Sequence, residues 1–167
     1  MSRAGNAAPG IASARSSLQV DIQRRGRGWA PRKGDIILWA GSALGRRGSG
    51  AEVGVRVVGP AESRRLNARY RGKDKPTNVL SFPAQWSSAL LAAPRPLGDL
   101  VICAQVVRSE AREQGKGLRA HWAHLVVHGA LHLIGYDHER IRDARRMERR
   151  EIVVLRRLGF ANPYLSR

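Results

Sequence analysis

Three histidines in the C-terminal half of the chain have the spacing of a metal site. Residues 128–138 read HGALHLIGYDH, so His128 and His132 are four residues apart and His138 follows six residues later. On an α-helix, residues four apart share one face, with Cβ atoms about 5–6 Å from each other. Gly135 can take the left-handed conformation that ends a helix, which lets the chain turn and bring His138 to the same point. Three neutral imidazoles arranged in this way form a catalytic type of zinc site with one open position, and we expect one Zn²⁺ per chain.

The residue after the first histidine bears on which chemistry the ion would support. Zinc proteases place a glutamate there as general base, whereas this chain has Gly129. Zinc with three neutral ligands keeps its double positive charge, lowers the pKa of bound water and stabilises an anionic transition state. A phosphodiester suits such a site, because its transition state depends on cations more than on a nearby carboxylate. The pattern favours phosphodiester cleavage, and a zinc-dependent hydrolase of another substrate, such as a peptidase, is the alternative.

Other polar residues near the three histidines leave alternatives open. His124 lies four residues before His128 and could pair with it, but the turn at Gly135 favours the set of 128, 132 and 138. We interpret His124 as a core or supporting residue and His121 as a residue at the helix start. Asp137 could orient a ligand imidazole, because metal-bound histidines usually donate their other N–H to such a group.

A cationic loop precedes the metal segment in the sequence. Arg71, Lys73 and Lys75 lie within five residues of one another, and such side chains bind phosphate groups. A solvated charged turn is the alternative reading of this loop. Asp99, further along the chain, is either a residue bonded to local backbone at a strand start or a group near the metal.

Composition limits the class of protein. A chain of 167 residues suits one domain, and it has no run of 18 apolar residues, so we expect no membrane span. The net charge of +17 indicates a polyanionic partner, most commonly nucleic acid, although 26 of the 30 basic residues are Arg and codon bias in the host is an alternative cause. The single cysteine, Cys103, excludes an internal disulfide and is consistent with a cytoplasmic location. Residues 1–17 are expected to be a disordered extension, with a transit peptide as the alternative, and residues 18–167 a single domain.

Hydrophobic periodicity predicts strands and helices in a mixed order. Alternation predicts strands at 18–23 and 52–58, and apolar runs predict strands at 79–82 and 97–103. Helices are expected at 34–44, 61–70, 104–114, 118–134 and 143–158, and the last has Met147, Ile152, Val153, Leu155 and Leu158 as candidate core residues. Strands and helices do not alternate strictly. The fold class is therefore α+β, a single domain in which a small mixed sheet packs against a central metal-bearing helix with flanking helices.

Three ordered motifs make the chain resemble the YbeY family. The first is LN at 66–67 followed by YRGKDKPTNVLSFP at 70–83, and the second is LGDLVIC at 97–103. The third is HWAH at 121–124 followed by HGALHLIGYDH at 128–138. The resemblance covers about residues 52–160, with a weaker fit back to Leu18, and the Arg-rich loops at 24–27 and 46–50 depart from it.

The resemblance implies a function as well as a fold. It implies a single-strand-specific endoribonuclease that acts in 16S ribosomal RNA 3′-end maturation, ribosome quality control and RNA turnover, with the small ribosomal subunit as partner. It also implies zinc bound by His128, His132 and His138, and a functionally needed arginine at Arg71. We expect Lys73 and Lys75 to help Arg71 bind RNA. A ribosome assembly factor that binds RNA and holds a purely structural metal is the remaining alternative.

Overall fold

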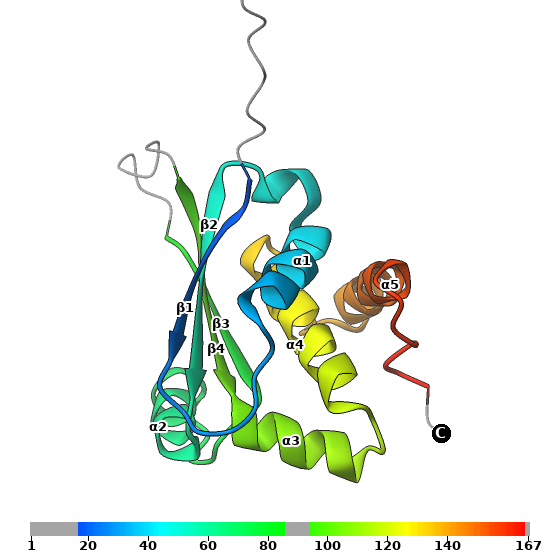
Figure 1. The fold of residues 1–167 in the computed structure, drawn as a ribbon. Helices are drawn as coiled ribbons and strands as arrows, with labels where there is room; N and C mark the ends of the chain where they lie inside the picture. Colours follow the sequence, from blue (N-terminus) through cyan, green and yellow to red (C-terminus); the bar gives the residue numbers. More distant parts are fainter. Residues whose placement is uncertain (1–16, 86–93, 166–167) are drawn as a thin grey trace, which may run out of the picture.

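The computed structural model describes residues 17–85 and 94–165. The expected N-terminal extension, apart from its last residue, lies outside these ranges. The described chain forms one α+β unit in which a four-stranded sheet carries helices on both faces (Figure 1). The fold class inferred from the sequence is confirmed. No helix among the described residues is long and apolar enough to cross a membrane.

The sheet has the strand order β1-β2-β4-β3. Strands β1, β2 and β4 are parallel, and β3 pairs antiparallel with β4. Alternate residues of β2 are fully buried, as expected for a strand with one face on the core. The strands are β1 (Gln19–Arg24), β2 (Ala51–Val58), β3 (Val79–Pro83) and β4 (Arg95–Cys103).

Helix α4 (Leu118–Leu133) lies at the centre of the molecule, between the sheet and the outer helix α5 (Ile141–Arg157) (Figure 1). Apolar side chains surround most of α4, and ten of its 16 residues are buried, which is typical of a helix enclosed by other elements. Gly129 of this helix lies against the sheet, and its carbonyl accepts a hydrogen bond from Ser81 Oγ. The predicted central position of the helix that contains His128 and His132 is thus confirmed.

The remaining helices surround this centre. Helix α1 (Lys33–Leu44) packs beside α4 on the same face of the sheet, and a short 3₁₀ helix, η1 (Gly45–Gly48), follows it. Helix α2 (Pro60–Arg71) covers part of the opposite face, and α3 (Ala104–Glu113) continues directly from β4. The predicted core of α5 is wrong in one residue, because the side chain of Val153 is 42% exposed. Its neighbour Val154 is buried instead.

Candidate metal centre and cationic groove

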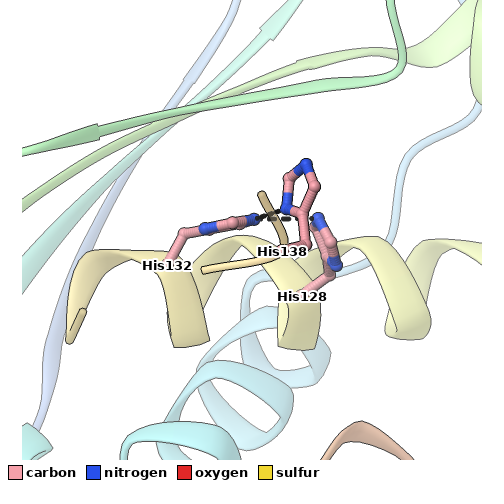
Figure 2. A group of neighbouring side chains, drawn as sticks. All are labelled: His128, His132 and His138. Carbon is pink, nitrogen blue, oxygen red and sulfur yellow. Dashed lines mark hydrogen bonds between the residues drawn. The ribbon is translucent and has the colours of Figure 1, made fainter. Parts of the chain in front are cut away.

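The side chains of His128, His132 and His138 converge on one point (Figure 2). The first two come from one face of α4, and His138 arrives from the segment that follows the helix. Nε2 of His132 lies 3.2 Å from Nε2 of His128 and 3.0 Å from Nδ1 of His138. Gly135 has φ +95°, a conformation that favours glycine, so the turn expected after the helix is present.

These spacings fit a tetrahedral zinc ion. Zn–N bonds of about 2.0–2.1 Å at tetrahedral angles separate the ligand nitrogens by about 3.3 Å. The two separations from His132 are within about 0.3 Å of that value, and the ligand atoms of all three histidines lie within 4.8 Å of one another. Among the residues that the structure describes, these three form the group, which leaves one position of a tetrahedron to a water molecule or a substrate.

Glu151, on α5, holds His128 in the orientation that this site requires. Its carboxylate is fully buried, and Oε1 lies 2.5 Å from Nδ1 of His128. Oε2 accepts a hydrogen bond from the hydroxyl of Tyr164 and lies 3.3 Å from Nε2 of His124. A proton on Nδ1 of His128 leaves Nε2 free as a ligand, and carboxylates behind metal-bound histidines act in this way.

The charges around Glu151 and His132 suit a site that binds a cation. Burial alone would raise the pKa of Glu151, but hydrogen bonds to His124 and His128 outweigh it and lower the pKa to about 2. Burial, together with repulsion from His128 and His138, lowers the pKa of His132 to about 4. At neutral pH the carboxylate is therefore charged and His132 is uncharged, which is the form that binds metal.

A second group of potential ligands shares one histidine with the first. His124, His128 and Glu151 also lie close enough together to hold an ion. The 2.5 Å contact between His128 and Glu151 is a hydrogen bond in length, and it directs Nε2 of His128 toward His132 instead. The first group is therefore the better metal centre, and His124 contacts the supporting carboxylate.

The metal centre opens into a groove with a volume of about 440 Å³. All five histidines of the chain line it, together with Arg71 and Lys116. Glu110 is the only carboxylate among the described residues that line it. An excess of cationic groups over carboxylates in a hollow favours the binding of anions.

Arg71 reaches this groove from the last residue of α2. Gly72 ends the helix in the left-handed conformation, and the loop that follows folds back onto α2. The side chain of Asn67 donates to the carbonyl of Lys75, and Ser63 Oγ bonds both the N–H and the carbonyl of Thr77. These bonds hold the later part of the loop against α2, the helix whose last residue is Arg71.

Lys73 and Lys75 do not share the position of Arg71. Both are exposed, and neither lines the groove. Of the three cations in the loop, the structure therefore brings only Arg71 together with the histidines.

Two aspartates considered from the sequence have other surroundings. Asp137 Oδ1 accepts hydrogen bonds from the backbone N–H groups of His138 and Glu139, so it shapes the turn, and Glu151 is the carboxylate that meets a ligand imidazole. Asp99 lines a different hollow with Asp21 and Glu52. Its neighbour Leu100 faces Gly129, and because successive strand residues point to opposite faces, Asp99 lies on the sheet face away from the metal centre.

Sequence reasoning missed four polar residues of the groove and its wall: Glu110, Lys116, Glu151 and Tyr164. Glu110 accepts hydrogen bonds from Asn78, and its Oε2 lies 2.8 Å from Nε2 of buried His121. Burial would raise the pKa of Glu110, but the bonds to His121 and Asn78 outweigh it and the pKa is lowered. The available signal was in α5, where Glu151 lies four residues from both Met147 and Leu155 on the buried stripe.

Comparisons with known proteins show which family the chain resembles. The family model described as "Endoribonuclease YbeY" matches residues 37–159. A protein of Halorhodospira halophila (strain DSM 244 / SL1) named "Endoribonuclease YbeY" is 49% identical over 153 residues, which covers 91% of this chain and 99% of that protein. A Thermotoga maritima protein whose structure was determined in solution has a similar fold, with a TM-score of 0.51 and 24% identity over 86% of this chain and 99% of that one.

Proposed function

We propose that this protein carries out a zinc-dependent reaction at the three histidines. The chain belongs to the endoribonuclease YbeY family and is therefore a nuclease, a hydrolase that acts on RNA. The substrate we propose is single-stranded RNA, with the 3′ end of the 16S ribosomal RNA precursor as the target. The setting is the cytoplasm, in contact with the small ribosomal subunit, where cleavage serves maturation and ribosome quality control. The observation that carries the proposal is the presence of three convergent imidazoles and Arg71 in one groove.

We propose a separate role at the scissile phosphate for each group of residues. His128, His132 and His138 would hold Zn²⁺, which supplies positive charge beside the scissile phosphate and activates water as a nucleophile. Arg71 binds the non-bridging oxygens and neutralises their charge, and Lys116 adds a second cation at the groove wall. Glu151 keeps His128 in the ligating tautomer. Lys73 and Lys75, exposed on the loop after Arg71, would bind RNA phosphates outside the groove.

A preference for single strands is supported by the shape and lining of the groove. The scissile phosphate must enter a hollow to reach the histidines, and a flexible strand can do so while a stacked duplex resists it. Tyr164 lines the same groove, with its hydroxyl fixed by Glu151 and its side chain 42% exposed. Unstacked bases bind to aromatic side chains of this kind.

The test uses purified protein with a single-stranded and a duplex RNA of the same sequence, each with and without a chelator. We expect cleavage of the single strand only, and only without chelator. His132→Ala should abolish metal-dependent cleavage. Equal cleavage in the presence of chelator would contradict zinc dependence.

An assembly factor with a purely structural metal is the main rival. A structural zinc site normally has four protein ligands, whereas three are found here among the described residues, and His138 is exposed. Circular dichroism of the chelated protein separates the two functions. A catalytic site predicts loss of cleavage with most of the helical signal retained, and a structural site predicts unfolding.

A further inference from the structure

We propose that a second hollow, lined by four arginines behind the turn that carries His138, binds the phosphate backbone of the RNA beyond the cleaved bond. The hollow has a volume of about 520 Å³ and is lined by Arg46, Arg47, Arg146 and Arg150. We call it the arginine hollow. The inference rests on RNA being the substrate, and it adds a place where the same strand is held.

The arginine hollow carries a net positive charge. Two aspartates, Asp137 and Asp143, also line it. However, none of its four arginines forms an ion pair with any carboxylate in residues 17–85 and 94–165. Guanidinium groups gathered without carboxylate partners repel one another, and a phosphate chain that binds between them relieves this repulsion.

Two of the arginines are held in place by contacts that leave their charge available. Nη1 of Arg47 donates to the carbonyl of Ile134, 2.8 Å away. The guanidinium of Arg146 lies over the ring of Tyr136, with Cζ 5.3 Å from the ring centroid. Neither partner is an anion, so each contact orders a side chain without cancelling its charge. Such ordering lowers the entropy cost of binding a ligand.

The arginine hollow and the metal groove share one thin wall. Residues 134–137 line the hollow, while His132, two residues before that segment, and His138, directly after it, line the groove. Four residues span at most about 14 Å of extended chain, so the two sites are only a few nucleotides apart. A strand that leaves the groove past His138 therefore reaches the arginine hollow.

A pair of matched variants tests this site without relying on cleavage. Arg146→Gln/Arg150→Gln removes two cations from the hollow, and Arg145→Gln/Arg149→Gln removes two from the same helix at the same spacing but outside it. Gln and Arg have similar helix propensities, so both double variants should fold alike. Metal content, measured for each, checks that the neighbouring His138 turn is undisturbed.

Binding of single-stranded RNA is measured in chelator at several salt concentrations, with a dinucleotide, which is too short to reach from the groove to the hollow, and with a strand of about 16 nucleotides. For the longer strand we expect the slope of log affinity against log salt to become less steep by about 1.4 in the hollow variant, about 0.7 for each lost phosphate contact. The control variant should keep the slope of the unaltered protein, and the short strand should bind all three proteins alike.

Two results would overturn the inference: equal slopes for the two double variants, or an equal loss with short and long strands. The first would mean that only overall charge matters. Because no cleavage is involved, an arginine hollow that binds RNA in a protein that fails to cut it would count against the proposed nuclease reaction and not against the hollow.

Discussion

Replacing Glu151 by Gln should weaken zinc binding without removing any ligand of the ion. The substitution preserves the shape of the side chain and removes its negative charge. The Glu151 carboxylate carries that charge at neutral pH because its pKa is lowered to about 2. An amide oxygen can still accept from Nδ1 of His128. The amide nitrogen can donate to Nε2 of His124 or to the hydroxyl of Tyr164, so no buried polar group must lose its partner.

The size of the effect follows from the contact with His128. Hydrogen bonds to a charged group contribute about 1.5–3 kcal/mol and neutral ones about 0.5–1.5 kcal/mol, so the exchange costs about 1–1.5 kcal/mol at this one bond. Loss of the carboxylate's attraction for the ion adds to this. The sum agrees with the losses of about 10–100-fold in metal affinity that follow when a carboxylate behind a ligand histidine is removed.

Zinc affinity is measured by competition with a chromophoric chelator at neutral pH, and thermal unfolding of the metal-free proteins checks the fold. Glu148→Gln is the matched control, because Glu148 is exposed on the same helix and the chemical change is identical. Tyr164→Phe removes one hydrogen bond to Glu151 but leaves its charge, so a smaller loss is expected. If Glu151→Gln binds zinc within about twofold of the unaltered protein, Glu151 does not support the site.

Three further predictions address the groove and the helix that carries it. Arg71→Gln should slow RNA cleavage by about 10–100-fold at unchanged zinc content, because a charged hydrogen bond to phosphate is lost. Arg69→Gln, on the same helix but outside the groove, should leave the cleavage rate unchanged. Equal rates for both variants would contradict the phosphate contact. Gly129→Ala should lower the free energy of unfolding, measured with urea, by up to about 2 kcal/mol. The new Cβ would lie 2.8 Å from Cδ2 of fully buried Leu100, and this crowding outweighs the gain in helix propensity. A more stable variant would show that the side chains around position 129 can move to make room for the methyl group. Glu110 has a pKa below its ordinary value of 4.5, so its contribution to stability is complete above that pH and is lost as the pH falls. The Glu110→Gln variant should therefore lose less stability on acidification than the unaltered protein. An equal loss by both proteins would contradict a stabilising role of the Glu110 charge.

The convergence of the three histidines could be predicted from the sequence because local geometry determines most of it. The spacing of His128 and His132 fixes their common face on any α-helix, and Gly135 is the residue type that lets the chain turn back. The short segment between Gly135 and His138 then suffices to bring His138 to the other two histidines. The boundaries of every predicted helix and strand agreed with the structure within a few residues for the same reason, since apolar periodicity is a local property, whereas the short 3₁₀ helix η1 was not predicted.

The support for the centre could not be predicted so easily, because it depends on how distant elements pack. Glu151 is separated from His128 by a turn and most of a helix, and it meets the histidine only because α5 docks against α4. In an Arg-rich helix, a glutamate is ordinarily a solvated residue. Its position four residues from both Met147 and Leu155 marks it as buried, and the same stripe would have excluded Val153 from the core.

The absence of a glutamate at position 129 follows from the packing of α4 and also bears on the substrate. The helix lies so close to the sheet that even a methyl group at Gly129 would press against Leu100 and Ser81, so a carboxylate at this position would have no room. Glu110, the one carboxylate among the described residues that line the groove, is bound by Asn78 and His121, and its lowered pKa makes it a weak base. A peptidase needs a carboxylate poised to accept a proton beside the ion, and the described groove residues offer none. Phosphodiester cleavage makes a smaller demand on a base and a larger one on positive charge, which Arg71 and Lys116 supply.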